Sequence, residues 1–327
     1  MQKGNVIINN NLVYLNVSGN WCVYDQSKEP LGSGAMGTVY YGFMSGTKIP
    51  VAIKKVKDIY SNDINIRNRA RQEAALMFRH RNLVEMLGLC EWEYNRGPMF
   101  IVSKYVHGET FDKFVQTKLG TMPSMKRIRT ICSMVMPVFE ALHYLHNNNI
   151  LHMDIKPSNI MVENGNNIRL MDLGIAYTEA YQSTNTSNMM GTPKYAAPEQ
   201  FGRMGTNKSV DNRTDIYELS VTIYELLCGE NPFLSHTFEE LIEKHKTLLL
   251  PYHKSIPKPI MDVLRKAAHP DKKMRYSNIV DFKNEFKKST EILNNENEHN
   301  KKNPLLLVSV ITLLLLTVLG IICLILM

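Results

Sequence analysis

The chain has 327 residues, of which 44% are hydrophobic and 21% charged, and this ordinary balance excludes a disordered or fibrous protein. Its length exceeds what one hydrophobic core usually fills, so we expect two lobes or domains with additional segments. The five cysteines are scattered and form no C-x-x-C pair, which argues against a disulfide framework or structural zinc and favours a reducing compartment.

The net charge of +7 would suit either nucleic acid or an anionic membrane surface as a partner. No RNA-binding or helix-turn-helix signature accompanies the charge, so we expect no nucleic-acid partner and weigh the membrane more heavily. Local basic sets such as Arg67, Arg69 and Arg71 are more typical of a solvated helix face.

Residues 1–23 are predicted to form an N-terminal extension. Short apolar runs on either side of Asn9, Asn10 and Asn11 indicate a small hairpin ahead of the main domain. The chain does not start with the charged and then apolar stretch of a secretion signal, and Gly4 is not the second residue that N-myristoylation requires. We therefore expect the N-terminus to stay in the cytosol.

A glycine-rich segment follows, within a strand-like region from about residue 24 to residue 59. Its G-x-G-x-x-G pattern, at Gly32, Gly34 and Gly37, also occurs in dinucleotide-binding proteins. In those proteins a helix opens directly after the third glycine, whereas here residues 38–41 continue as a strand. The pattern therefore favours a hairpin whose backbone N–H groups approach a phosphate closely.

Three polar residues further along, Asp154, Asn159 and Asp172, have the spacing that magnesium-dependent phosphoryl transfer needs. The rate of such a transfer comes from positioning and from neutralising charge on the moving group. Asp154 would accept the proton of the incoming hydroxyl group, while Asn159 and Asp172 would hold the Mg²⁺ ions that bridge the nucleotide phosphates. The alternative is a polar loop whose carboxylates only cap helices or bind solvent.

The motifs around these residues resemble those of the protein kinase family. The catalytic loop reads H-M-D-I-K-P-S-N at 152–159 and is followed by D-L-G at 172–174, while V-A-I-K stands at 51–54 and G-T-P-K-Y-A-A-P-E at 191–199. The resemblance to eukaryotic-type Ser/Thr kinases covers about residues 24–288. The overall layout is similar to that of a bacterial member, and a tail-anchored eukaryotic protein would share it.

The resemblance implies an α+β, bilobal protein-kinase fold. A small β-rich N-lobe would occupy residues 24–108, and a larger helical C-lobe would occupy residues 109–288. The long amphipathic patterns that begin at about Thr110 agree with a helical C-lobe.

The resemblance also implies a site for ATP. Lys54 would contact the α- and β-phosphates, and Glu73, in a helical run, would hold Lys54, with Asp63 as the less suitable candidate. Lys156 would meet the γ-phosphate and is typical of Ser/Thr rather than Tyr kinases. The residues assigned to ATP binding are Leu31, Gly32, Ser33, Gly34, Ala35, Met36, Gly37, Thr38, Val39, Ala52, Lys54, Lys104 and Val106.

Five further residues are given structural roles by the resemblance. In the family, Thr192 lines the site near the base, and Glu199 pairs with a distant arginine, which would be Arg275 here. Asp215 would anchor the backbone of the catalytic loop, which His152 begins.

Met153 departs from the family pattern, because many kinases have an arginine there that pairs with a phosphorylated residue of the activation segment. Methionine cannot make that pair. Our hypothesis is that activation does not depend strongly on phosphate at Thr184, Thr186 or Ser187, although these hydroxyl groups remain candidates for autophosphorylation.

The composition changes after Lys288. Residues 289–303 are polar and poor in large apolar groups, so we predict a flexible linker. Pro304 then opens an uncharged run over 305–327, which as a helix rising ~1.5 Å per residue would span roughly 35 Å, against a hydrocarbon core of about 30 Å. We predict a transmembrane helix over 304–327. A buried or partner-binding helix is the alternative, but such helices seldom lack every polar face.

The charges beside this run predict its orientation. Lys301 and Lys302 flank its N-terminal side, and together with the missing signal peptide the positive-inside bias leaves residues 1–303 in the cytosol. We therefore expect a single-pass membrane protein with a C-terminal anchor and a cytosolic kinase domain.

The sequence thus predicts a Mg²⁺- and ATP-dependent enzyme that transfers a γ-phosphoryl group to Ser and Thr hydroxyl groups of proteins. We expect the reaction at the cytosolic face of a membrane, where a dimer would be a route to autophosphorylation. The rival is a membrane-tethered pseudokinase that binds partners without transferring phosphate. A small-molecule kinase would share the chemistry but would not need the A-P-E segment or the helix that carries Asp215. ATP turnover by the wild type but not by Asp154→Asn separates an enzyme from a scaffold.

Overall fold

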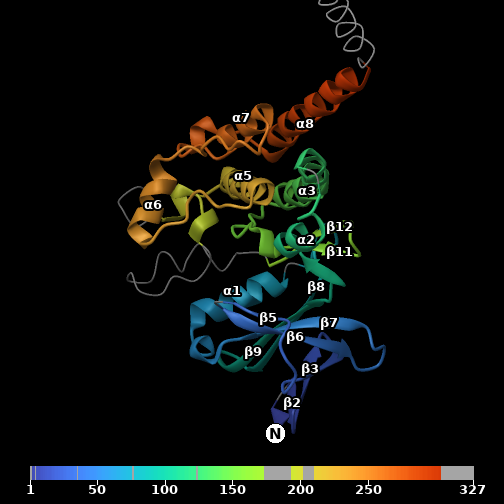
Figure 1. The fold of residues 1–327 in the computed structure, drawn as a ribbon. Coiled ribbons are helices and arrows are strands. Elements are labelled where there is room, and N and C mark those ends of the chain that lie inside the picture. The colour runs from blue at the N-terminus through green and yellow to red at the C-terminus, as the bar shows by residue number, and fades with distance from the viewer. Residues whose placement is uncertain are drawn as a thin grey trace, which may run out of the picture.

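The computed structural model describes residues 2–3, 5–34, 36–75, 77–122, 124–172, 193–201 and 210–302. In Figure 1 these residues form a β-rich lobe, which contains α1, and a helical lobe stacked against it. The α+β, bilobal architecture expected from the sequence is therefore confirmed.

Among the described residues of the small lobe, nine strands form one sheet in the order β1-β2-β3-β4-β6-β7-β9-β8, with β5 paired to β6. The bounds are Gln2–Lys3 (β1), Val6–Asn9 (β2), Leu12–Val17 (β3), Asn20–Asp25 (β4), Gly32–Ser33 (β5), Gly37–Met44 (β6), Pro50–Val56 (β7), Met86–Glu93 (β8) and Arg96–Lys104 (β9), with a 3₁₀ turn at Asp58–Tyr60 (η1). Side chains alternate between the two faces, so Val51 and Ile53 are buried while Ala52 and Lys54 point the other way.

The N-terminal extension contributes to the core of this sheet. β2, β3 and β4 are consecutive antiparallel strands, and the turn between the last two has positive φ at Ser18 (51°) and Gly19 (85°), as a type I′ hairpin requires. Val6, Val13 and Leu15 lie in one buried cluster with the core side chains of β7 and β9. The extension therefore shares its apolar core with the strands that carry the glycine loop and Lys54.

α1 (Ile64–Ala75) packs against this sheet. We expected Arg67 on a solvated helix face, and this was wrong, because Arg67 is fully buried. It donates to Glu91 Oε1 at 2.6 Å and to the carbonyl oxygen of Gly97 at 2.8 Å, and Arg71 donates to the same Glu91 oxygen at 2.9 Å. Partners on the β8–β9 hairpin thus offset the cost of burying the charge and hold α1 in place.

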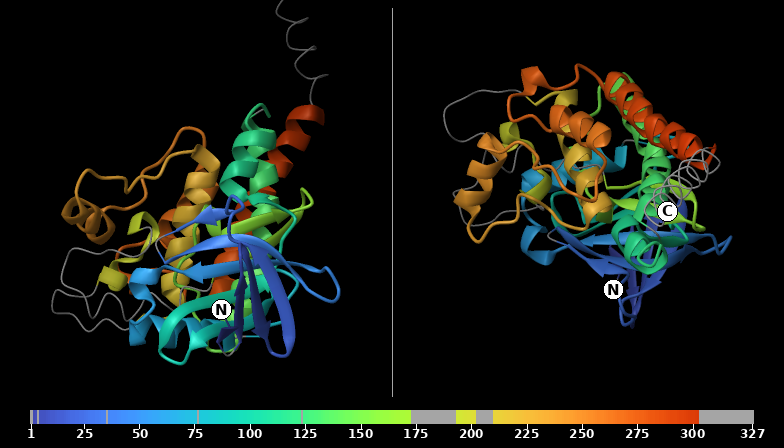
Figure 2. Two further views of the ribbon diagram at one scale, coloured as in Figure 1. Left: turned by 90° about the horizontal axis from the view of Figure 1, so that it is seen from below. Right: turned by 45° about the horizontal axis from the view of Figure 1, so that its top comes forward.

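Helices make up most of the larger lobe. Their bounds are Phe111–Lys118 (α2), Ser124–Asn147 (α3), Asn212–Cys228 (α5), Phe238–Thr247 (α6), Lys258–Ala267 (α7) and Ile279–Lys302 (α8), with 3₁₀ turns at Pro157–Asn159 (η2), Pro193–Tyr195 (η4), Pro198–Phe201 (η5) and Lys272–Met274 (η6). A three-stranded sheet of Gly108–Thr110 (β10), Ile160–Glu163 (β11) and Asn167–Leu170 (β12) packs against α2 and α3. α5 is buried on all sides from Thr214 to Tyr224, and α8 runs beside α3, as Figure 2 shows.

The end of the described chain differs from the predicted linker. α8 continues through Lys302, so residues 289–302 are helical. The segment contains glutamate, lysine and leucine, which are good helix formers, and Lys287 Nζ lies 3.8 Å from Glu291 Oε1 one turn further on.

Within the residues that the structure describes, no helix combines the length and the apolar character needed to cross a membrane. The predicted transmembrane run, 304–327, lies outside those residues.

Candidate active site

The catalytic loop lies between α3 and η2, and its side chains converge on Asp154. The ammonium group of Lys156 donates to both carboxylate oxygens of Asp154, at 2.9 and 2.7 Å. Asn159 Nδ2 donates to the main-chain oxygen of Asp154 and to its Oδ2, both at 2.8 Å. The Asp154 side chain is still 23% exposed, so a hydroxyl group from solvent or from another molecule can reach a carboxylate that these two donors already orient.

Lys54 of the small lobe and Asp172 of the large lobe lie close together. Lys54 lies on β7 of the small lobe, and Asp172 follows β12 of the large lobe. Lys54 Nζ is 3.6 Å from Asp172 Oδ1, and the two side chains are 19% and 40% exposed. Val39, just after the glycine loop, lies directly opposite Lys54 on the neighbouring strand. An anion held under the glycine loop would therefore meet the ammonium group of Lys54.

Asn159 and Asp172 can supply oxygen ligands to a magnesium ion. The amide nitrogen of Asn159 is bonded to Asp154, which leaves Oδ1 of the amide as a ligand atom. In the described part of the chain, no three His, Cys, Asp or Glu side chains come together as a metal cluster. Mg²⁺ does not need such a cluster, because it keeps several waters and usually binds one or two carboxylates together with substrate phosphates. The residues present therefore fit Mg-ATP.

His152 couples Asp154 to the segment that carries Asp172. Burial lowers the pKa of its imidazole, so the ring is neutral. Nδ1 accepts the N–H of Asp154 at 3.3 Å, which assigns the ring hydrogen to Nε2, and Nε2 donates to the carbonyl oxygen of Met171 at 3.1 Å. One buried ring thus ties the amide of Asp154 to the residue just before Asp172.

Asp215 of α5 holds the backbone of the catalytic loop. It accepts the N–H groups of His152 and Met153, both at 2.9 Å, and its Oδ2 lies 2.7 Å from His146 Nε2. Met153 has a φ of 66°, which is uncommon for a residue with a side chain and is supported here by the bond to Asp215. This is the contact that the kinase resemblance implies for Asp215.

Glu199 and Arg275 form a buried ion pair between η5 and the residue after η6. Arg275 donates to both carboxylate oxygens of Glu199, at 2.8 and 2.9 Å, and to the carbonyl oxygens of His269 at 2.7 Å and Arg213 at 3.0 Å. Thr214 Oγ1 donates to Glu199 Oε1 at 2.8 Å. Burial alone would raise the pKa of Glu199, but the hydrogen bonds and charge of Arg275 outweigh it, and the pKa is lowered.

Comparison with known proteins agrees with this geometry, because residues 25–293 match the family described as the protein kinase domain. The chain belongs to the protein kinase family. Serine/threonine-protein kinase PknB of Mycobacterium leprae is 33% identical over 220 residues, which are 66% of this chain and 34% of that protein. Serine/threonine-protein kinase PrkC of Bacillus subtilis is 30% identical over 265 residues, or 79% of this chain and 39% of that protein.

A vertebrate relative, serine/threonine-protein kinase ULK3 of Xenopus laevis, is 30% identical over 264 residues, which are 79% of this chain and 54% of that protein. The chain spans well under half the length of the two bacterial relatives. The likeness is therefore one of kinase domains.

The glycine loop of this kinase domain is a tight hairpin of β5 and β6. The N–H of Gly34 donates to the carbonyl oxygen of Gly37 at 2.9 Å, and that of Leu31 to Val39 at 2.8 Å. A Cβ at Gly37 would lie 2.5 Å from the carbonyl oxygen of Lys55, so the close approach of β7 requires glycine there. The Ser33 and Thr38 hydroxyl oxygens lie 3.3 Å apart across the hairpin, and Met36 packs against the apolar cluster under α1.

Lys104 was predicted at the nucleotide, and in the structure its side chain forms an ion pair. It ends β9, opposite Val51 of β7, and its Nζ lies 2.5 Å from Glu85 Oε2. This ion pair lines a hollow of about 390 Å³ at the connection between the lobes, and Val106 lines the same hollow. Because the charge of Lys104 is paired with Glu85, an adenine contact at this position would come from its main chain.

Some predicted residues lie wholly or partly outside the described part of the chain. Glu73 falls within α1, as predicted, but its side chain is not described. The others are Ala35, Thr192 and the activation-segment hydroxyl residues Thr184, Thr186 and Ser187.

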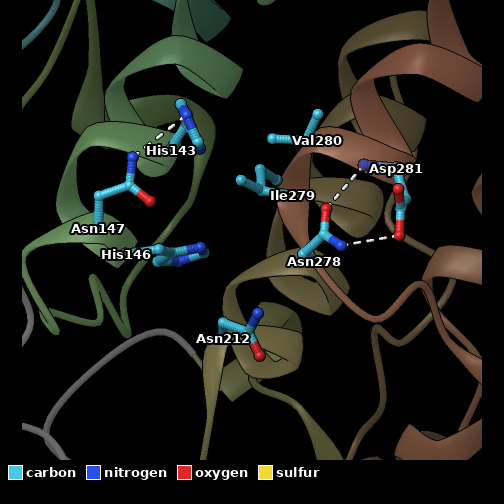
Figure 3. Close-up of a pocket in the computed structure, with 8 residues that line it drawn as sticks. All are labelled: His143, His146, Asn147, Asn212, Asn278, Ile279, Val280 and Asp281. Carbon is cyan, nitrogen blue, oxygen red and sulfur yellow. Dashed lines mark hydrogen bonds between the residues drawn. The ribbon is translucent and has the colours of Figure 1, made fainter.

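A hollow of about 460 Å³ lies between α3, α5 and α8 and is distinct from the nucleotide site. Figure 3 shows His143, His146 and Asn147 on one side and the start of α8 on the other. No residue assigned to ATP binding lines it, although His146 connects its wall to Asp215. The hollow therefore borders His146, which contacts the loop anchor Asp215, and it does not border the phosphate site.

The sequence reasoning missed Glu218, Thr222 and Gln200, all of which bond to the catalytic loop. Glu218 Oε2 accepts the N–H of Ile155 at 2.8 Å, Thr222 Oγ1 donates to the carbonyl oxygen of Ile155 at 3.0 Å, and Gln200 Nε2 donates to that of Met153 at 3.3 Å. Polar residues at 215, 218 and 222 within a largely apolar helix were the available signal, because this spacing puts them on one helix face.

Proposed function

We propose that this chain is a Mg²⁺- and ATP-dependent protein kinase that transfers the γ-phosphoryl group of ATP to Ser and Thr hydroxyl groups of proteins. The observation that carries the proposal is the convergence on Asp154, whose Oδ2 accepts from Lys156 at 2.7 Å and from Asn159 at 2.8 Å. Lys54 of the other lobe lies 3.6 Å from Asp172. A proton acceptor, a phosphate-binding ammonium group and oxygen ligands for Mg²⁺ are the parts that phosphoryl transfer needs.

Each side chain has one role in this reaction. Asp154 accepts the proton of the substrate hydroxyl group as the hydroxyl oxygen bonds to the γ-phosphorus, while the bond from the γ-phosphorus to the β-phosphate oxygen breaks and ADP leaves. Lys156, already bonded to Asp154, lies where its charge can balance the charge of the transferred group. Lys54 holds the α- and β-phosphates, so the γ-phosphoryl group is kept in line with the hydroxyl oxygen. Asn159 and Asp172 would hold magnesium, whose charge would offset that of the phosphates.

Specificity for Ser and Thr is supported by two observations. Lys156 stands two residues after Asp154, the position at which a lysine is usual in Ser/Thr kinases. PknB, PrkC and ULK3 are all named as serine/threonine-protein kinases.

Transfer of γ-labelled phosphate to a generic protein substrate tests the proposal. We expect label on Ser and Thr, and a rate that falls about 10²- to 10⁴-fold in Asp154→Asn, because the proton acceptor is lost. Asp262→Asn is a matched control, since Asp262 lies on α7 in an exposed pair with Lys258, and its rate should stay at the wild-type level. ATP binding without transfer by the wild type would favour the scaffold, and label confined to Tyr would contradict the specificity.

A membrane location is a second part of the proposal. The run 305–327 contains no charged residue, and Lys301 and Lys302 precede it, which supports an anchor with the kinase domain on the cytosolic side. Alkaline extraction should leave the full chain in membranes and release a chain that ends at Asn303. Leu316→Arg should weaken insertion by about 3 kcal/mol, whereas Leu316→Ala should remain inserted. Release of the full chain by alkali would contradict the anchor.

Copies held in one membrane would meet often enough to phosphorylate one another. Incubating the wild type with a size-tagged Asp154→Asn chain tests this. Label on the Asp154→Asn chain would support transfer between copies, and label confined to the wild type would exclude it.

A further inference from the structure

A second carboxyl group of α5, besides Asp215, contacts the catalytic loop. Glu218 is 1% exposed and lies one turn after Asp215, so both side chains leave the same face of the helix. Its Oε2 accepts the N–H of Ile155 at 2.8 Å, and Thr222, one turn further on, donates to the carbonyl oxygen of Ile155 at 3.0 Å. Ile155, the residue directly after Asp154, is therefore held at both its N–H and its C=O by α5.

These contacts divide the support of the loop into two parts. Asp215 holds the N–H groups before Asp154, at His152 and Met153, while Glu218 holds the first N–H after it. The peptide between Asp154 and Ile155 is thus fixed next to the side chain that accepts the proton. Without the bond from Glu218 this peptide could rotate and carry Asp154 with it, and a displacement of about 1 Å at a reacting group can cost about 10²-fold in rate.

The surroundings of Glu218 decide which substitutions can replace it. Burial, together with the neighbouring carboxylates of Asp215 on α5 and Asp154 on the catalytic loop, raises its pKa well above the usual value. Hydrogen bonds from the Ile155 N–H and from Gln200 act in the opposite direction but are weaker. The charged form of Glu218 is therefore disfavoured, and the contact in the structure, from the Ile155 N–H to Oε2 at 2.8 Å, needs an oxygen acceptor at that reach.

We propose that Glu218 is a positioning residue for phosphoryl transfer, which holds Asp154 in place through the N–H of Ile155. The proposal rests on the kinase activity proposed above. It assigns to Glu218 an effect on the chemical step and none on the binding of ATP, because Lys54 and the glycine loop lie on the other lobe.

Three substitutions of Glu218 test this role. Glu218→Gln keeps an oxygen acceptor at the same reach, Glu218→Asp keeps the acid but is one methylene too short, and Glu218→Met keeps the length without an acceptor. Ser220→Ala is the matched control, since Ser220 is buried on the same helix but bonds to the carbonyl oxygen of Leu264 and not to the catalytic loop.

We expect Glu218→Met and Glu218→Asp to lower kcat about 10- to 100-fold with KM for ATP within about twofold of wild type, while Glu218→Gln and Ser220→Ala keep kcat within about threefold. Circular dichroism at the assay temperature confirms that each variant is folded. If Glu218→Met does not fold, Glu218→Asp decides. A wild-type kcat in Glu218→Met and Glu218→Asp, an equal loss in Glu218→Gln, or a change confined to KM would overturn the proposal.

A second measurement separates this proposal from the kinase activity itself. Hydrogen exchange at the Ile155 amide should quicken at least about 10-fold in Glu218→Met and stay slow in Glu218→Gln, whether or not phosphate is transferred. Slow exchange in Glu218→Met would overturn the positioning role. An inactive wild type with the expected exchange pattern would overturn the kinase activity and, with it, the catalytic purpose of the contact, while the contact itself would stand.

Discussion

Replacing Arg275 by methionine should destabilise the C-lobe by about 3–5 kcal/mol, the cost of leaving a buried carboxylate without its charged partner. Arg275 is 5% exposed and Glu199 is 7% exposed, so solvent offers little compensation. The substitution removes both bonds to Glu199 and the bond to the carbonyl oxygen of His269, while the Thr214 hydroxyl group still donates to Glu199. Because domains are stable by roughly 5–15 kcal/mol, this loss is a large share of the total.

Far-UV circular dichroism is the suitable probe. The two tryptophans, Trp21 on β4 and Trp92 on β8, report on the small lobe, whereas Arg275 packs among the helices of the large lobe. We expect the melting temperature to fall by roughly 6 to 20 °C, at about 2–4 °C per kcal/mol for a domain of this size. A fall of less than about 2 °C would refute the view that the pair is buried and unrelieved by water.

Glu199→Gln completes a double-mutant cycle with Arg275→Met. A neutral amide needs no charged partner, so Glu199→Gln should cost less free energy in the Arg275→Met background than in the wild type. The pH dependence gives a second check. The pKa of Glu199 is lowered from 4.5, so the stability that the pair contributes is present above that pH and is lost as pH falls through the lower folded value. The difference between wild type and Arg275→Met should therefore shrink in acid, and an equal difference at neutral and acid pH would contradict the assignment.

Three further outcomes are expected. Deleting residues 1–17 should lower the melting temperature measured by tryptophan fluorescence. The reason is that the small lobe loses several buried side chains, each of which contributes about 1.5–3 kcal/mol. An unchanged melting temperature would mean that the extension folds separately. Arg67→Leu should cost about 2–4 kcal/mol and reduce kcat as α1 loosens, whereas a matched change at exposed Arg79 should do neither. Replacing Thr184, Thr186 and Ser187 together by alanine should leave kcat within about threefold of wild type, and loss of activity in a folded protein would contradict the hypothesis drawn from Met153.

The chemistry-bearing residues could be predicted because short motifs carry them. Asp154, Lys156 and Asn159 lie within six residues, so their mutual contacts follow from one loop, and the structure does bring them together. The ion pair of Lys104 could not be predicted in this way. Its neighbours in the chain indicate a strand near the adenine, but the partner of its charge, Glu85, comes from the segment before β8 and could not be identified from local pattern.

Arg67 is a second residue whose partners could not be predicted from its neighbours in the chain. A basic residue in a polar helical run is usually solvated, and the helix pattern alone gave no reason to bury it. The β8–β9 hairpin supplies a carboxylate and several carbonyl oxygens at one point, and these partners offset the desolvation cost of burying the charge.

The sequence by itself determined the set of reactive groups and their order along the chain, because short motifs carry them, and the resemblance of those motifs to the kinase family implied the two-lobed fold. Beyond the anchor at Asp215, only the tertiary structure decided what holds those groups in place. Glu218 and the N–H of Ile155 are 63 residues apart in the chain and 2.8 Å apart in space. A buried polar group must find a partner wherever the fold supplies one, and that requirement acts over distances that local pattern does not reach.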